Sequence, residues 1–356
     1  LLLFACDVIS LAVFAGCFAF SIFVLLILLN FEAGFLTLIF LRSSLDILKI
    51  YGGATELNVA GLFSVAIIIL GSFYLLYRKQ NVFEFQDALP FLIFIGVCGI
   101  SSMRSQYPMN SFEDWVRLVS IFFIYALTRA VATNPDKIQR TFKIVLLSAL
   151  APILVAFVQL FQNGFSFSVM TRVTGTFLHP NAFASYLLIL LVFCSAFYLE
   201  RKSPMSRFAL ALIIVPSSIL FLFTMSRGAW AVFVVAMSFM GFIRYRKILV
   251  YLPILLIVLG ASMPGVRDRI LDVVDPTHIK GRSAWEWRLD TWSEISPIFE
   301  KRPILGHGLS AIETEFGVLM HNDYLRVIAE TGVVGLSAYI ILSLCLLHFT
   351  WKDYRA

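Results

Sequence analysis

Residues 333–349 read VVGLSAYIILSLCLLHF, a run without Asp, Glu, Lys or Arg that is long enough to cross the hydrocarbon of a bilayer. The polar stretch HNDYLR at residues 321–326 lies shortly before it, with Gly332 and Gly335 at the junction. A polar cluster at the mouth of a span is costly in lipid, so by default it indicates a functional site. The alternative interpretation is an interfacial histidine with two glycines that ease helix packing.

The same apolar character extends along the whole chain. Of its 356 residues, 60% are hydrophobic and 14% are charged, whereas a soluble domain has about 25% charged residues. The segment 33–48 is apolar but ends in charged residues, so it is predicted to be a short or tilted span. Clearer spans are predicted at 6–29, 60–77, 88–103, 112–132, 140–162, 180–199, 206–224, 228–243, 247–263 and 324–349. We therefore expect an all-α polytopic membrane protein, a bundle of about 11–12 transmembrane helices.

The charged residues predict the orientation of these spans. Lys and Arg cluster after every second span, as expected for cytoplasmic connections, and this accounts for the net charge of +6 without a nucleic-acid partner. The opposite, outer side then holds residues 104–111, 163–179, 225–227 and 264–323. We expect three parts: a transmembrane bundle (1–263), a large outer loop containing short helices (264–323), and a C-terminal helix with a cytoplasmic tail (324–356). Because the chain does not begin with Met, we also expect residues before it.

Polar residues on the predicted outer side are candidates for chemistry. Arg172 and Asn181 flank the entry to a span, where the alternative interpretation is a well-capped helix start. Arg227 lies between two spans with almost no loop, so it needs a partner. Arg282 and Arg288 lie in or beside a predicted amphipathic helix, 283–295, and a guanidinium can hold phosphate oxygens bidentately.

A histidine side chain ordinarily titrates near neutrality, so His321 is a candidate base. Asn322 and Tyr324 beside it are candidate substrate contacts. The histidines predicted on the outer side have no close-spaced ligand pair, and nucleotide-binding and serine hydrolase motifs are absent from the sequence, so we expect no metal and no cofactor. The five cysteines lie in apolar stretches and are expected to pack rather than to bind metal or pair.

These motifs together resemble the O-antigen ligase and polymerase superfamily of bacterial envelope glycosyltransferases. The ligase signature, a histidine followed by Asn, Ser or Gln, nine residues and G-x-x-G, is met by His321-Asn322 and Gly332/Gly335. Further matches are Arg172 with His179-Pro180-Asn181, Ser226-Arg227-Gly228, and the segment 303–308. The resemblance covers roughly residues 100 to 350.

The resemblance implies a GT-C-like bundle in the bacterial inner membrane, with a periplasmic active site. It implies an inverting, metal-independent transfer of a glycan from undecaprenyl diphosphate to a sugar hydroxyl of lipid A–core. Arg227 and Arg288 would then hold the diphosphate and His321 would be the catalytic histidine, with Arg172 and Arg282 as further candidates.

Two alternatives remain open. An O-antigen or exopolysaccharide polymerase, or another polysaccharide ligase of the same superfamily, uses a similar donor but takes a second lipid-linked glycan, or a different molecule, as acceptor. A flippase for lipid-linked oligosaccharides would also explain a membrane bundle with basic residues, but it is disfavoured because the sequence has no internal repeat and its polar candidates gather on one predicted side.

Overall fold

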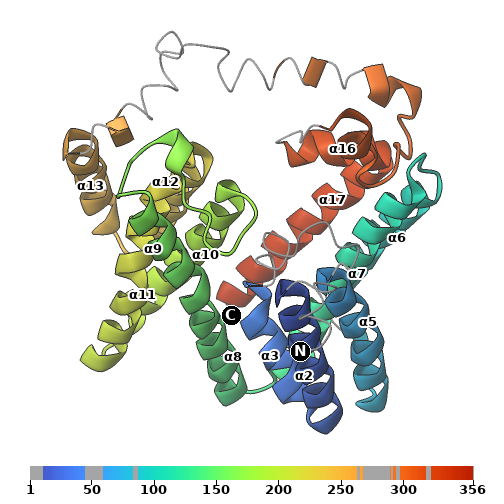
Figure 1. Ribbon diagram of the computed structural model, residues 1–356, viewed down its shortest axis with the longest axis horizontal. Helices are drawn as coiled ribbons and strands as arrows, with labels where there is room; N and C mark the ends of the chain where they lie inside the picture. Colours follow the sequence, from blue (N-terminus) through green and yellow to red (C-terminus); the bar gives the residue numbers. More distant parts are fainter. Residues whose placement is uncertain are drawn as a thin grey trace. The chain divides into compact units, whose positions relative to one another are not determined.

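The described residues of this protein form a helical structure. The computed structural model describes residues 11–44, 59–82, 87–262, 265–267, 289, 292–293, 297–317 and 322–355. All regular secondary structure within these residues is helical, and none of them forms a strand (Figure 1). Four of these helices are long and apolar enough to cross a membrane, and five shorter apolar helices accompany them. The prediction of an all-α polytopic membrane protein is confirmed.

The chain forms two compact units. Unit 1 combines Leu1–Leu57 with Gln139–Lys280, and unit 2 combines Asn58–Ile138 with Gly281–Ala356. Most of the predicted periplasmic loop 264–323, including most of the predicted helix 283–295, lies outside the described residues, so the predicted three-part division stays a prediction.

Unit 1 is built around α10. Its buried side chains Phe183, Leu187 and Leu191 pack in one apolar cluster with residues of the neighbouring helices, such as Leu160 and Leu220. The helices of this unit are α2 (Leu11–Leu29), α3 (Phe31–Arg42), α8 (Pro135–Ser148), α9 (Leu150–Gln162), α10 (Pro180–Glu200), α11 (Pro204–Phe223), α12 (Arg227–Ile243) and α13 (Ile248–Ser262). The first four residues of α8 precede the unit boundary.

The predicted span 140–162 consists of two helices, α8 and α9, which meet at Ala149. Pro152 has no N–H to donate to the carbonyl of Ser148, four residues earlier. That carbonyl accepts a hydrogen bond from Ser43 Oγ instead, at 2.8 Å. The serine after α3 thus satisfies the backbone group that the proline leaves open, and it fixes α3 to the break.

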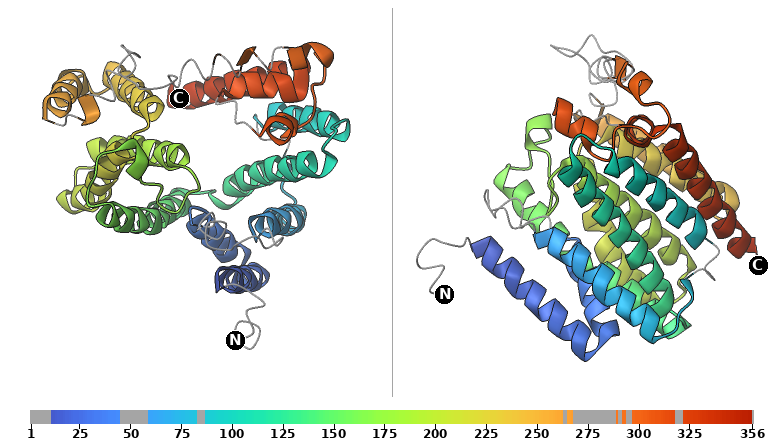
Figure 2. Two further views of the ribbon diagram at one scale, coloured as in Figure 1. Left: turned by 45° about the horizontal axis from the view of Figure 1, so that its top comes forward. Right: turned by 90° about the vertical axis from the view of Figure 1, so that its right-hand side faces the viewer.

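Unit 2 contains α5 (Val59–Tyr77), α6 (Ala88–Met103), α7 (Pro108–Val131), α16 (Ala311–Phe316) and α17 (Asp323–Arg355). The helix α17 runs alongside α6 in both figures (Figure 2). Phe94 and Cys98 of α6 pack against Ala338 and Leu342 of α17, which forms the apolar contact between the two helices. Helix α17 is kinked at Gly332, where φ is 69°.

Candidate functional site

Gln159, a half-buried residue of α9, makes three hydrogen bonds to the backbone of the loop between α9 and α10. Its Oε1 accepts hydrogen bonds from the backbone N–H groups of Thr174 and Gly175, both at 2.9 Å, and its Nε2 donates to the carbonyl of Gly175 at 2.9 Å. Gly175 has a φ of 58°, and a Cβ there would lie 2.9 Å from the carbonyl oxygen of Pro152. The amide of α9 therefore fixes the loop where it turns back toward α10.

Arg172 connects this loop to the turn between α11 and α12. Its Nε donates to the carbonyl of Thr224 and its Nη2 donates to Oδ1 of Asn181, both at 2.6 Å. The backbone N–H of Val173 also donates to the carbonyl of Phe223 at 3.3 Å. Arg172 and Asn181, two of the predicted substrate-binding residues, are thus hydrogen-bonded to each other.

Arg227 is the first residue of α12, three residues after the carbonyl that Arg172 contacts. Ser226 precedes it in the N-cap position and makes no side-chain capping hydrogen bond. The start of a helix carries a partial positive charge from its backbone dipoles. The half-buried side chain of Arg227 adds a guanidinium at the same helix end.

His179 serves as the cap of α10. Its Nδ1 accepts a hydrogen bond from the N–H of Asn181 at 3.1 Å, and Pro180 occupies the first helical position. The capped helix start that was the alternative interpretation of this motif is therefore present. It also places Asn181 where its side chain orients Arg172.

In unit 2, the segment 303–308 (PILGHG) inserts into the kink of α17. The N–H groups of Val333 and Val334 donate to the carbonyls of Pro303 and Ile304, at 2.8 and 3.3 Å. In an unbroken helix these two N–H groups would donate to the carbonyls of Ala329 and Glu330. Those carbonyls accept from the N–H groups of His307 and Gly308 instead, at 3.1 and 2.8 Å.

Two glycines make this close approach possible. A Cβ on Gly332 would lie 2.2 Å from the carbonyl oxygen of Ile304, and one on Gly306 would lie 2.3 Å from the carbonyl carbon of Glu330. Both glycines also have φ between 65° and 70°, a region that side chains rarely adopt. Gly306 and Gly332 therefore allow residues 303–308 to pack directly against residues 329–334, although these segments are distant in the sequence. We call residues 303–308 and 329–334 the helix-kink clasp.

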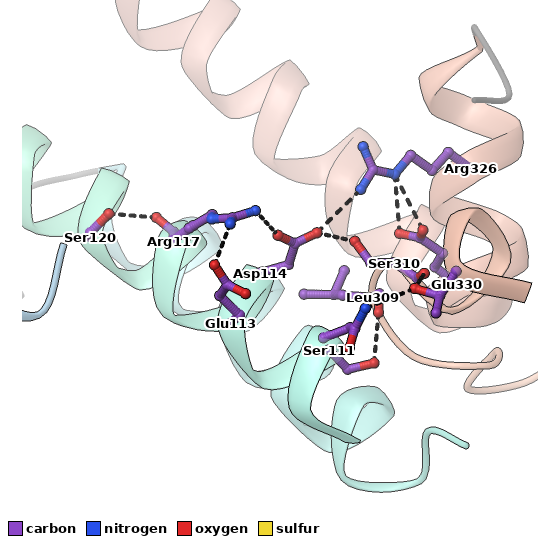
Figure 3. Close-up of polar contacts among 11 residues, drawn as sticks. Ser111, Glu113, Asp114, Arg117, Ser120, Leu309, Ser310, Arg326 and Glu330 are labelled. Carbon is purple, nitrogen blue, oxygen red and sulfur yellow. Dashed lines mark hydrogen bonds and ion pairs between the residues drawn. The ribbon is translucent and has the colours of Figure 1, made fainter. Parts of the chain in front are cut away.

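A network of charges flanks the clasp (Figure 3). Arg326 Nε lies 3.3 Å from both carboxylate oxygens of Glu330, and its Nη2 lies 3.6 Å from Asp114 Oδ2. Asp114 also accepts from Ser310 Oγ and forms an ion pair with Arg117, one turn further along α7. Because Glu330 is only 2% exposed, its carboxylate depends on this cation.

Asn322 is the cap of α17. Its Oδ1 accepts hydrogen bonds from the N–H groups of Tyr324 and Leu325, at 3.0 and 3.2 Å. Tyr324 is 60% exposed, and its ring centroid lies 5.9 Å from that of Tyr339 in an edge-to-face arrangement. The other three predicted site residues, Arg282, Arg288 and His321, lie outside the described residues.

The structure thus places the predicted residues in two groups. Arg172, Asn181 and Arg227 come together in unit 1, whereas Asn322 and Tyr324 lie at the start of α17 in unit 2. Sequence reasoning missed Asp114 and Glu330. The spacing of four residues between Arg326 and Glu330 was a visible signal, since such pairs lie on one helix face.

A comparison with protein families gives one match. A family described as O-antigen ligase matches residues 211–340, which include the start of α12 and the helix-kink clasp. No curated protein and no solved structure matches the chain. The match over residues 211–340 supports membership of the chain in the O-antigen ligase and polymerase superfamily.

Proposed function

We propose that this protein is a membrane glycosyltransferase of the O-antigen ligase type. It would transfer a glycan from undecaprenyl diphosphate to a sugar hydroxyl of lipid A–core, with inversion at the anomeric carbon and without a metal. The family match supports a ligase- or polymerase-type function. The observation that carries the donor assignment is the convergence of Arg172, Asn181 and Arg227 at one end of unit 1.

The bonds of Arg172 support a role in binding an anion. Its hydrogen bonds to the Thr224 carbonyl and the Asn181 amide oxygen hold the guanidinium at the end of unit 1 where α12 begins. A guanidinium can hold phosphate oxygens bidentately. Arg227, at the positive end of α12, would add a second cation to the same diphosphate.

The remaining predicted residues have roles in the transfer step. His321 would accept the proton of the acceptor hydroxyl while that oxygen forms a bond to the anomeric carbon. The bond from this carbon to the diphosphate breaks, and the electron pair leaves with undecaprenyl diphosphate. Arginines beside the departing oxygens, including Arg288 and Arg282, would stabilise the negative charge. Asn322 and Tyr324 would contact the sugars.

The proposal also implies where the protein and its active site are located. The protein would lie in the bacterial inner membrane with its active site facing the periplasm, since the residues assigned to the donor belong to segments predicted on that side by the distribution of Lys and Arg. Within unit 1, the segments 163–179 and 223–227 meet at one end, which supports a common side for Arg172 and Arg227.

The test is transfer by purified protein, supplied with an undecaprenyl diphosphate-linked glycan and lipid A–core. Arg227→Ala, Arg288→Ala and His321→Ala should each lose most of the transfer, and activity should persist in EDTA. Arg140→Ala, which removes an exposed arginine on α8, is the matched control and should retain activity. Near-normal transfer by all three site variants would overturn the proposal.

The acceptor is tested separately by product size. When the lipid-linked donor and lipid A–core are supplied together, a ligase attaches a glycan to lipid A–core and shifts its size, whereas a polymerase joins donor glycans to each other and leaves lipid A–core unmodified. With lipid-linked repeats alone, a polymerase extends them into a ladder. A ladder without any lipid A–core product would replace the ligase assignment by the polymerase assignment.

A further inference from the structure

Unit 1 has a second notable feature at the other end of its helices. A groove of about 850 Å³ lies among α10, α12 and α13 and is bordered by the connection 244–247. Its apolar wall is formed by Leu199, Phe233, Met237, Ile248, Leu252 and Leu255. Several of these side chains are half-buried or exposed, so the groove opens to the surroundings of the helices rather than being a closed core cavity.

The mouth of this groove is strongly basic. Arg244, Arg246 and Lys247 line it, and all three side chains are exposed. Arg244 forms an ion pair with Glu200 at 3.4 Å, and Glu200 is the one acidic residue between positions 198 and 251 of the sequence. The mouth of the groove therefore has more positively charged side chains than the single carboxylate of Glu200 can compensate.

Two tyrosines add to this pattern. Tyr245 lies at the mouth, with its ring beneath the Arg244 guanidinium at 5.8 Å, and Tyr251 follows on α13 with 66% of its surface exposed. Tyrosine is enriched where a membrane protein meets the headgroup region, because its ring is apolar and its hydroxyl is polar. The basic mouth and the tyrosines are thus the side chains expected at the level of the lipid phosphates, and the apolar wall is the kind of surface expected beside the lipid tails.

The groove is distinct from the candidate site around Arg172. Both α10 and α12 begin at that site, with Pro180 and Arg227, and end at the groove, with Glu200 and Ile243. At 1.5 Å per residue, the 21 residues of α10 separate the two ends by about 30 Å. This is the thickness of the hydrocarbon core of a bilayer.

We propose that this groove binds one anionic glycerophospholipid of the surrounding bilayer. The phosphate would lie between Arg246 and Lys247, with Arg244 held nearby by Glu200, and one acyl chain would lie along the apolar wall. Charge complementarity selects this occupant, since an apolar groove alone would accept any lipid whereas the basic mouth favours a negative headgroup. The inference does not depend on the transfer reaction.

The experiment compares lipid binding to the full chain reconstituted in nanodiscs or detergent, by native mass spectrometry with phosphatidylglycerol and phosphatidylcholine. The test variant is Arg246→Gln/Lys247→Gln/Arg244→Gln. The matched control, Arg78→Gln/Lys79→Gln/Lys352→Gln, removes the same charge from exposed residues on the same predicted side. Each basic residue near a lipid phosphate is expected to contribute about fivefold in affinity, so the test variant should lose at least about tenfold for phosphatidylglycerol.

Three results would overturn the inference: equal binding of both lipids by the unaltered protein, unchanged phosphatidylglycerol binding in the test variant, or an equal loss in the control. A further variant, Met237→Trp, fills the groove without altering charge and should also displace the lipid. Size-exclusion profiles and thermal unfolding of each variant report whether it is folded. Competition with inorganic phosphate should have little effect, because the acyl chain contributes to binding; full displacement by phosphate alone would contradict a lipid site.

Discussion

Arg172 in unit 1 and Arg326 in unit 2 are both half-buried arginines near a helix start, but their partners differ. Arg172 donates to a backbone carbonyl and to an amide oxygen, at 2.6 Å each. Arg326 is paired with two carboxylates, those of Glu330 and Asp114. The hydrogen bonds of Arg172 join the loop before α10 to the turn before α12, whereas the ion pair of Arg326 with Asp114 joins α17 to α7. We therefore expect Arg326 to contribute mainly to the stability of unit 2, and we propose that Arg172 contributes to binding the donor.

The largest expected effect concerns the stability of unit 2. Arg326→Met leaves the buried carboxylate of Glu330 without its cation, which should lower the free energy of unfolding by about 3–5 kcal/mol. Denaturant titration of the purified protein measures this loss. The double variant Arg326→Met/Glu330→Met should recover most of it, because both charges are removed together. Unchanged stability of Arg326→Met would end the structural assignment of this arginine.

The helix-kink clasp should be nearly as sensitive. Gly332→Ala places a Cβ 2.2 Å from the carbonyl oxygen of Ile304 at a φ of 69°, so we expect a loss of about 2–4 kcal/mol in the free energy of unfolding. Gly96→Ala is the control, because a Cβ on Gly96 meets nothing within 4 Å. It should be neutral or slightly stabilising in the same titration. Equal stability of the two variants would show that the close approach of the clasp does not matter.

Arg172 should show the opposite pattern. Arg172→Ala should lower kcat/KM for glycan transfer by about 100-fold, equivalent to about 2.7 kcal/mol of transition-state stabilisation. Loss of its hydrogen bonds to the Thr224 carbonyl and the Asn181 amide oxygen should lower the free energy of unfolding by only about 1 kcal/mol. Steady-state transfer kinetics and denaturant titration on the same preparation separate the two effects. A loss of stability as large as that of Arg326→Met, with normal kcat/KM, would erase the difference between the arginines.

The smallest effect is expected at the start of α17. Asn322→Ala removes a cap that accepts from the N–H groups of Tyr324 and Leu325, so the free energy of unfolding should fall by about 1 kcal/mol. Asn322→Asp preserves the cap oxygen and should retain stability. If Asn322→Asp is stable but fails in glycan transfer, Asn322 contacts the substrate in addition to capping the helix.

The positions of the spans could be predicted from the sequence because apolar runs of this length are typical of helices that cross the hydrocarbon core of a bilayer. The predicted span 88–103 coincides with α6, and 228–243 differs from α12 by one residue. The break in 140–162 was not predicted, because it depends on Pro152 together with Ser43, which is distant in the sequence. A hydropathy pattern does not show that Ser43 bonds to the Ser148 carbonyl, and so it does not show the helix break that this bond supports.

The candidate site was predictable only in part, for a similar reason. Arg172, Asn181 and Arg227 could be proposed from their places beside spans, and the structure brings them together in unit 1. The role of Gly332 as a contact point for Ile304 depends on a backbone pairing between segments about 25 residues apart, which spacing alone does not predict. The same holds for Asp114, whose partners lie in α17 and before α16.

The central claim is that the charge of Arg172 and Arg227 holds the diphosphate of the donor. The most direct measurement is the Kd of undecaprenyl diphosphate for the protein in nanodiscs, with Arg172→Gln, Arg227→Gln and the control Arg140→Gln. We predict that each site variant weakens binding by at least about tenfold, about 1.4 kcal/mol, while the control and the thermal stability of all three stay near those of the unaltered protein. Unchanged affinity in both folded site variants would contradict the claim.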